Sequence, residues 1–355
     1  MLKDLLKQLF TSKAAREHAG LNLARELLQI SEFDHAVNML DGLLRVSPNF
    51  AQAWCLRAQV LRKQGKLQQA LADLERALAL APDDAECRFE LAGVCLELGD
   101  TAGSRKHCET ARRLAPDDTR VFGMLANAML PGEFYFDVLR RIVAHLEPRI
   151  YVEIGVFQGD SLKLVRRAEA VVGIDPQPQL TWTLDPHMRI FNETSDAFFE
   201  KYDLTRELGG RAVDLAFIDG LHQFEFALRD FTNLERHCHR NSTILVHDCY
   251  PIDALSASRE PRHVNWSGDI WRLVVLLKKY RPDLEIHTIA TAPTGLTIVS
   301  NLDPASTFLR DNLPRLYEEF LALDYTYLET NKDEKLNLVP NDWSRIVPFL
   351  RSPKG

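Results

Sequence analysis

Ile150-Tyr-Val-Glu-Ile-Gly-Val-Phe-Gln-Gly-Asp-Ser161 is the stretch that decides the fold of this 355-residue chain. The apolar run from Ile150 to Ile154 breaks into two glycines, Gly155 and Gly159, and apolar residues at helical spacing follow from Leu162. A strand, a glycine turn and a helix in this order are typical of a ligand cradle in an α/β sheet, because glycine lets the backbone approach a ligand closely. The stretch therefore predicts a ligand site at the end of a strand.

A second apolar run, Val171 to Ile174, follows at the distance expected of a βαβ unit and ends at Asp175. A carboxylate at this place can accept hydrogen bonds from both hydroxyls of a ribose, so the pattern favours a nucleoside ligand. The dinucleotide fingerprint would need glycines at positions 157 and 160, where the chain has Phe157 and Asp160. A nucleoside cofactor other than NAD is therefore expected.

Further apolar runs extend this predicted sheet. Strands are expected at 188–191, 213–218 and 242–246, separated by helical segments, which indicates parallel strands covered on both faces. The segments 284–289 and 294–299 lie too close together for a crossover helix, so we expect them to pair antiparallel.

Ionisable residues gather at or just beyond the expected strand ends: Glu153, Asp175, Asp219, His222, His247 and Asp248. Ligands of such sheets bind at the carboxyl ends of the strands, so these side chains are the candidates for a site. The following segment 251–268 carries Arg259, Arg262, His263 and Trp266. A loop of this length is either a lid or substrate loop, or a disordered surface excursion.

The first 130 residues repeat with a period of 34. Copies at 17–50, 51–84 and 85–118 place small residues at their eighth and twentieth positions and a proline at the thirty-second. This pattern closely resembles the tetratricopeptide repeat, in which small residues let two helices of a hairpin pack closely. Residues 1–16 and 119–130 are expected to form flanking helices that cover the ends of the stack. Such a domain either binds a partner in its groove or only extends or dimerises the second half.

Composition places the chain among ordinary globular proteins, with 46% hydrophobic and 26% charged residues. The first 130 residues hold 17 Lys+Arg and 17 Asp+Glu, so the formal charge of −7 lies in the remainder. Neither part has the basic stripe expected of a nucleic-acid-binding protein. The six cysteines form no Cys-x-x-Cys pair and are expected to be buried thiols. Charges interrupt the N-terminal apolar run, and no stretch is long enough to span a membrane, so a soluble cytoplasmic protein is expected.

Residues 134–300 resemble a class I S-adenosylmethionine-dependent methyltransferase. Glu153, Gly155 and Gly159 match the first motif of that family, Asp175 its ribose-binding acid, and 194–199 its adenine-side segment. The segments 217–222 and 246–248, with 266–271 and 292–295, are similar to the branch of macrocin-type sugar O-methyltransferases. The resemblance implies a Rossmann-like α/β domain over 131–355, with a mostly parallel seven-stranded sheet and an antiparallel terminal hairpin, behind an all-α repeat domain over 1–130.

The resemblance also implies roles for single residues. The cofactor would be bound by Glu153, Gly155, Phe157, Gly159, Ser161, Asp175, Ser195, Asp196 and Asp219. For Ser195 and Asp196 the alternative is a helix N-cap, which both residue types favour.

Removal of the acceptor's proton is assigned to His222, Asp248 and His247, with His222 as the expected general base. The alternative for His222 is a cap on the helix that follows. Relatives that use Mg²⁺ would hold it on Asp219 and Asp248, but the neighbours of Asp248 are His247 and Cys249, which are poor Mg²⁺ ligands. Without a metal, Asp248 would orient a histidine or bind the acceptor hydroxyl.

The leading hypothesis is O-methylation of a hydroxylated small molecule, sugar or glycan, with the repeats binding a partner protein or a substrate carrier. One alternative is a repeat-based interaction protein whose methyltransferase-like domain is not catalytic. Another is a transferase that uses a different nucleoside cofactor, such as a glycosyltransferase.

Overall fold

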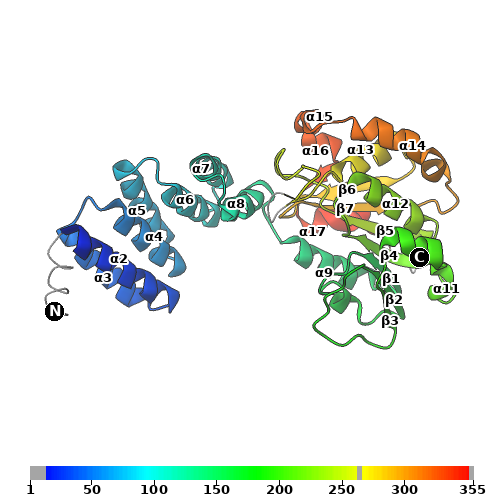
Figure 1. Ribbon diagram of the computed structural model, residues 1–355, viewed down its shortest axis with the longest axis horizontal. Coiled ribbons are helices and arrows are strands. Elements are labelled where there is room, and N and C mark those ends of the chain that lie inside the picture. The colour runs from blue at the N-terminus through cyan, green and yellow to red at the C-terminus, as the bar shows by residue number, and fades with distance from the viewer. Residues whose placement is uncertain (1–12, 262–265, 352–355) are drawn as a thin grey trace. The chain divides into compact units, whose positions relative to one another are not determined.

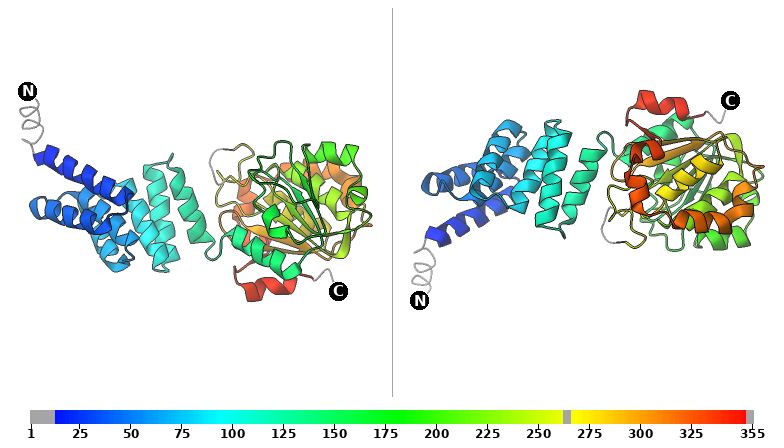
Figure 2. Two further views of the ribbon diagram at one scale, coloured as in Figure 1. Left: turned by 90° about the horizontal axis from the view of Figure 1, so that it is seen from below. Right: turned by 90° about the horizontal axis from the view of Figure 1, so that it is seen from above.

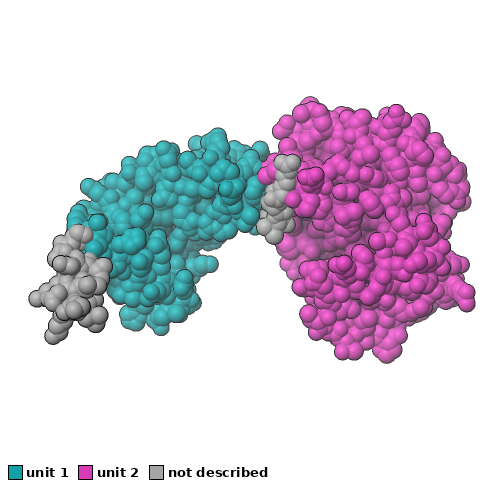
Figure 3. Space-filling model, in the orientation of Figure 1, with its two compact units in different colours: residues 1–129 teal, residues 130–355 magenta. Residues whose placement is uncertain are grey.

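The computed structural model describes residues 13–261 and 266–351, and the chain divides after Met129 into two compact units (Figure 3). Most of the predicted first flanking helix, and the loop residues Arg262 and His263, lie outside the described residues. Among the residues that are described, no helix combines the length and the apolar character needed to cross a membrane.

The first unit is built of helix pairs. Its helices are α2 Lys13–Gln29, α3 Phe33–Val46, α4 Ala51–Lys63, α5 Leu67–Leu80, α6 Ala85–Glu97, α7 Thr101–Leu114 and α8 Thr119–Met129 (Figure 1). The pairs α2–α3, α4–α5 and α6–α7 correspond to the three predicted repeats, and α8 is the predicted second flanking helix. The repeat architecture expected from the 34-residue period is confirmed.

Two features of the repeat explain why the helices pair. The small residues at the eighth and twentieth positions are at most 1% exposed, and they are Ala24, Ala36, Ala58, Ala70, Ala92 and Ser104. The fifteenth position turns the chain between the helices of each pair with a positive φ, and there Gly65 and Gly99 occupy the second and third repeats. The first repeat has Ser31 at φ 61°, a conformation that costs a residue with a side chain more than glycine.

The second unit contains one sheet in the order β3-β2-β1-β4-β5-β7-β6-β8. Its strands are β1 Ile150–Ile154, β2 Ala170–Ile174, β3 Met188–Phe191, β4 Val213–Ile218, β5 Cys238–His247, β6 Glu285–Ile289, β7 Leu296–Ser300 and β8 Leu338–Val339 (Figure 1). Strands β1 to β5 are parallel, and β7 runs antiparallel to β6, as predicted. It also runs antiparallel to its other neighbour, β5. The predicted number of seven strands is too low, because β8 from the C-terminal tail pairs parallel with β6.

Helices cover both faces of the sheet (Figure 2). On one face, α9 Tyr135–Leu146 packs with the 3-10 turn η1 Leu162–Val165, and α17 Trp343–Ile346 with η2 Val347–Phe349 lies beside it. On the other face lie α12 Phe224–Glu235, α13 Trp271–Tyr280 and α14 Phe308–Leu321. The prediction of a helix after Gly159 is wrong, because only the four-residue turn η1 forms there. Strand β2 already begins at Ala170, and α9 occupies that face of the sheet.

The unit also contains the short helices α10 Ser195–Lys201, α11 Leu204–Glu207, α15 Tyr325–Glu329 and α16 Lys332–Lys335.

The C-terminal tail, to which α15 and α16 belong, is tied to the loop that follows β5. The hydroxyl of Tyr250 donates to Asp333 at 2.7 Å, and the ammonium of Lys332 donates to the carbonyl of Pro251 at 2.8 Å. Lys332 and Asp333 therefore hold the segment that follows Asp248.

Candidate functional site

The turn after β1 needs glycine for two reasons. Gly155 has a φ of +88°, and a Cβ atom there would lie 2.0 Å from the carbonyl oxygen of Asp219 at the end of β4. Gly159 has a φ of +71°, and its Cβ would lie 2.5 Å from the side chain of Leu180. Any other residue would both strain the backbone and push neighbouring groups away, so the turn can approach β4 only with glycine.

Asp175 holds this turn in place. One carboxylate oxygen accepts from the N–H groups of Val156 at 2.8 Å and Phe157 at 2.9 Å, and the other accepts from the N–H of Gln177 at 2.7 Å. A carboxylate offers about four acceptor sites, so one stays open for a further donor. The ribose contact of Asp175 stays a prediction, and the structure adds a role in shaping the turn.

Glu153 is buried beneath the turn, with 1% of its surface exposed. Its oxygens accept from the hydroxyls of Tyr151, at 2.8 Å, and Ser161. Burial raises the pKa of Glu153 to about 8, the two hydroxyls oppose that shift, and the charges of Asp219 and Asp175 add to it. Glu153 is therefore largely protonated at neutral pH in the free protein, and a bound cation would favour its charged form.

A cavity of about 530 Å³ opens above these residues. It is lined by the turn from Gly155 to Ser161, by the first residues of α9, and by Glu153, Phe217 and Asp219. Aromatic side chains make up much of the wall, namely Phe134, Tyr135, Phe136, Phe157 and Phe217. A cavity with aromatic walls and several carboxylates suits a ligand that is partly apolar and positively charged.

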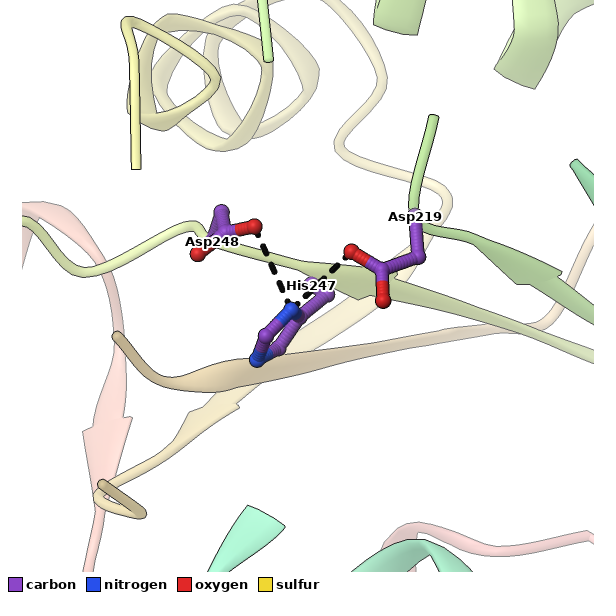
Figure 4. Close-up of side chains that lie close together, drawn as sticks. All are labelled: Asp219, His247 and Asp248. Atoms are coloured by element: carbon purple, nitrogen blue, oxygen red, sulfur yellow. Dashed lines mark hydrogen bonds and ion pairs between the residues drawn. The ribbon is translucent and has the colours of Figure 1, made fainter. Parts of the chain in front are cut away.

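Four side chains from the ends of β4 and β5 form what we call the strand-end cluster: Asp219, His222, His247 and Asp248. Because Ile218 and Val246 pair in the sheet, the residues that follow them become neighbours. Figure 4 shows His247 between two carboxylates: its Nδ1 lies 3.0 Å from Asp219 and 3.2 Å from Asp248. Nε2 of His222 lies 3.0 Å from the same oxygen of Asp248. The structure thus brings the three predicted catalytic residues together with Asp219.

The charges in this cluster are strongly coupled. Burial would lower the pKa of His247, but the negative charges of Asp248 and Asp219 outweigh burial and raise that pKa to about 10. Burial would raise the pKa of Asp248, yet His222 and His247 hold it well below its usual range. A positive charge on or near His247 therefore compensates the buried carboxylates. The two carboxylates assigned to Mg²⁺ by resemblance have an imidazole nitrogen between them, a ligand that Mg²⁺ disfavours.

His222 has acceptors at both ring nitrogens. Nδ1 lies 3.0 Å from the carbonyl oxygen of Trp266, whose ring stacks on the imidazole at 5.0 Å, while Nε2 faces Asp248. Capping of α12 by His222 is not observed, because Asp269 accepts from the N–H of Phe224 at 2.7 Å. His222 as general base stays a prediction, and in this geometry that role requires the contact between Nε2 and Asp248 to open.

Ser195 and Asp196 are not brought to the cavity. The N-cap of α10 is Thr194, whose hydroxyl accepts from the N–H of Ala197, so neither of the two predicted residues is the cap. Asp196 instead forms a bidentate ion pair with Arg229, with both distances 2.7 Å. Ser195 lies beside the buried Asp230. Neither residue lines the cavity, and their adenine contact stays a prediction.

Two parts of the site were not predicted from the sequence. Tyr135 stacks on His247 with ring centres 4.0 Å apart, and its neighbours Phe134 and Phe136 line the cavity. Three consecutive aromatic residues near the start of the second domain, at 134–136, were the signal that would have indicated this. The second part is Gly268, which lets its loop pack against the backbone of His222. A Cβ atom at Gly268 would lie 1.7 Å from the carbonyl oxygen of His222.

The described part of the predicted substrate loop is anchored rather than free. Arg259 pairs with Glu225 and with Asp269, which is fully buried. Trp266 is anchored in turn, because its indole N–H donates to the carbonyl of Ser258.

Comparison with known families agrees with the fold. Residues 152–249 match the family described as "Methyltransferase domain", and residues 21–71 and 61–128 match two families described as "Tetratricopeptide repeat". The chain therefore has a methyltransferase domain preceded by tetratricopeptide repeats. The methyltransferase family implies S-adenosylmethionine as the methyl donor. The macrocin-type branch stays a prediction.

Individual relatives match short parts of the chain. Bacteriophage adsorption protein A of Escherichia coli (strain K12) is 32% identical over 91 residues, which is 26% of this chain and 9% of that protein. DnaJ homolog subfamily C member 3 of Bos taurus is 29% identical over 99 residues, which is 28% of this chain and 20% of that protein. The chain thus spans less than a quarter of the length of these curated relatives.

Similar solved structures include a crystal structure of MamA, with 20% identity over 36% of this chain and 71% of that chain, at a TM-score of 0.30. Another is the first TPR of Spaghetti bound to an HSP90 peptide, with 15% identity over 32% of this chain and 89% of that chain, at a TM-score of 0.31.

Proposed function

We propose that the second unit transfers the methyl group of S-adenosylmethionine to a hydroxyl oxygen of a small molecule, sugar or glycan. The observation that carries the proposal is one continuous arrangement: the cavity above the glycine turn reaches Asp219, and Asp219 belongs to the partly buried strand-end cluster. This arrangement supports a cofactor site next to a group that takes up the acceptor's proton.

The cofactor would bind on the β1 side of this arrangement. Gly155, Phe157 and Gly159 would present backbone to it, Asp175 would accept from the ribose, and Glu153 with Ser161 would face its charged end. The aromatic walls and the carboxylates of the cavity favour a sulfonium cation.

The acceptor would bind on the β5 side. Transfer to oxygen needs the hydroxyl in line with the methyl group, at near-attack distance, and a group that takes its proton. His222 would supply that group, while Asp248 and the protonated His247 would orient it and balance its charge. We expect His222→Ala to keep its affinity for S-adenosylmethionine and to lose turnover, and unchanged turnover would exclude His222 from this role.

Calorimetry of the full chain with S-adenosylmethionine tests the proposal. We expect binding by the wild type, at least tenfold weaker binding by Asp175→Ala, and unchanged binding by Glu200→Ala, an exposed acid elsewhere in the unit. No binding by the wild type at saturating cofactor would refute it. A melting temperature raised by a nucleotide-sugar instead would favour another nucleoside-using transferase. Cofactor binding without release of S-adenosylhomocysteine, over a panel of hydroxylated acceptors, would favour the interaction-protein alternative.

We further propose that the repeats bind an extended peptide, because the first unit has its own cavity of about 550 Å³. It lies on α2, α4 and α6, the first helices of the three repeats, and Gln29, Gln52 and Gln59 contribute to its lining. Amide side chains both donate and accept, which suits a peptide backbone. Peptides selected from a random display library should lose binding to a Gln52→Ala/Gln59→Ala variant but not to Glu75→Ala on α5. Equal binding to both variants would exclude this groove.

A further inference from the structure

We propose that the strand-end cluster is a centre for a divalent transition-metal ion of the kind that imidazole binds well, such as Zn²⁺ or Fe²⁺, and not for Mg²⁺. The centre would hold the ion through Asp219, His222, His247 and Asp248. The ion's part in catalysis rests on the proposed function, whereas binding of the ion does not.

The candidate ligand atoms converge. One atom each from Asp219, His247 and Asp248 lie within 4.8 Å of one another, and His247 Nδ1 is 3.0 Å and 3.2 Å from the two carboxylates. His222 Nε2 is 3.0 Å from Asp248 and 3.8 Å from Asp219. Ligands about 2.0–2.2 Å from an ion lie roughly 3–3.5 Å from their neighbours in its coordination shell. The separations of 3.0 Å and 3.2 Å lie in that range, whereas the 3.8 Å between His222 and Asp219 lies above it.

Buried polar atoms in the cluster lack partners. The oxygen of Asp248 that faces both imidazoles forms no hydrogen bond within the described part of the chain, although two ring nitrogens lie within 3.2 Å. Asp248 is 3% exposed, so this oxygen is shielded from bulk solvent. A buried carboxylate oxygen that accepts no hydrogen bond is costly, and a cation bound to it and to both imidazoles would offset that cost.

The surroundings of His222 resemble the outer shell of a metal ligand. The carbonyl oxygen of Trp266 can only accept a hydrogen bond, so Nδ1 of His222 must carry a proton. In a neutral ring the lone pair is then on Nε2, the nitrogen that faces Asp248. Metal-binding histidines almost always donate their other nitrogen to a carbonyl or carboxylate in this way. The second oxygen of Asp248 accepts from the hydroxyl of Thr294, which fixes the carboxylate similarly.

The ligand set decides the class of ion. Two imidazole nitrogens and two carboxylate oxygens suit Zn²⁺ or Fe²⁺, whereas Mg²⁺ prefers oxygen ligands alone and keeps its waters. When bound, such an ion would lower the pKa of a hydroxyl that it coordinates. Stacking by Tyr135 and Trp266 restrains the two imidazole rings and so keeps both nitrogens directed at the cluster.

The test uses the full chain without a polyhistidine tag, stripped of metal and titrated separately with Zn²⁺, Fe²⁺ under anaerobic conditions, and Mg²⁺. We expect one Zn²⁺ or Fe²⁺ per chain, bound at least 100-fold more tightly than Mg²⁺. His247→Ala and His222→Ala should each weaken binding at least tenfold. Their matched control is His239→Ala, because His239 also lies 3.0 Å from a buried carboxylate, Asp214, but near the opposite end of β5.

Each outcome decides the proposal. Failure of the wild type to bind either transition ion, equal affinity for Mg²⁺, or unchanged affinity in both histidine variants would overturn it. If a variant does not fold, the wild-type titrations and the absorption spectrum of the Co²⁺-substituted wild type still decide, since bands of nitrogen-ligated Co²⁺ are expected. Binding of S-adenosylmethionine is measured in the same metal-free protein. Cofactor binding without metal binding overturns only the metal centre, and the reverse overturns only the proposed function.

Discussion

Glu153→Gln should change how the stability of the second unit depends on pH. The ordinary pKa of a glutamate is 4.5, and in the folded protein burial first of all raises the pKa of Glu153 to about 8. Between these two values the folded state binds a proton that the unfolded state has lost. The stability contributed by Glu153 is therefore fully present below about pH 4.5 and is lost as the pH rises to about 8. A glutamine has no such dependence.

The size of the effect follows from proton linkage. One proton contributes at most about 1.4 kcal/mol per pH unit, so the variant should gain up to about 3 kcal/mol relative to the wild type between pH 5.5 and 7.5. For a domain of this size that corresponds to roughly 5–10 °C in melting temperature.

Calorimetric melting of both proteins over this pH range measures the difference. The transition of the second unit should shift in the variant, while Glu200→Gln, an exposed control, should follow the wild type at every pH. A difference between Glu153→Gln and wild type that stays constant with pH would show that Glu153 is ionised throughout, and the reasoning from burial would be wrong.

Three further predictions concern backbone geometry and buried charge. Gly155→Ala should abolish measurable binding of S-adenosylmethionine, because the added Cβ meets the backbone of Asp219. Gly209→Ala, with φ +66° and open space around it, should cost only about 1 kcal/mol of stability and leave binding unchanged. An equal loss of cofactor binding in the two variants would contradict this reasoning. Arg281→Ala should lower the free energy of unfolding in urea by about 3–5 kcal/mol, since it leaves the buried Glu235 without its bidentate partner. The double variant Arg281→Leu/Glu235→Leu should recover most of that loss. Equal instability of both variants would argue against a charge effect. Ser31→Gly should stabilise the first unit by up to about 1 kcal/mol by relieving a positive φ, and a lower melting temperature would show that flexibility of the unfolded chain dominates.

The sequence predicts most of the sheet because local patterns mark its strands. The apolar runs at 188–191 and 213–218 have the bounds of β3 and β4, and the short gap between β6 and β7 required their antiparallel pairing. The repeats were equally readable, because each small residue recurs at a fixed period. In contrast, β8 has only two residues and exists through its pairing with β6, which leaves no local signal.

Side-chain partners were harder to predict than strand ends. Asp219 and His247 follow paired residues of adjacent strands, so sheet topology alone brings them together. Asp196 also lies just beyond a strand, yet its carboxylate forms an ion pair with Arg229, 33 residues away. Tyr135 reaches the cluster from a helix whose place on the sheet was not known in advance. The position of a residue in the chain therefore predicts at which edge of the sheet it lies, but not with which neighbour its side chain interacts.

The attachment of the tail has a consequence for the order of folding during synthesis. Each repeat contacts mainly its neighbours in sequence, so the first unit can fold while the ribosome is still making the second. The loop after Asp248 cannot be completed then, because its partners Asp333 and Lys332 follow Tyr250 and Pro251 by 83 and 81 residues. Until Leu338 and Val339 have been made, β6 also lacks its neighbour β8. The repeats can therefore be complete well before the segment beside the strand-end cluster is held in place.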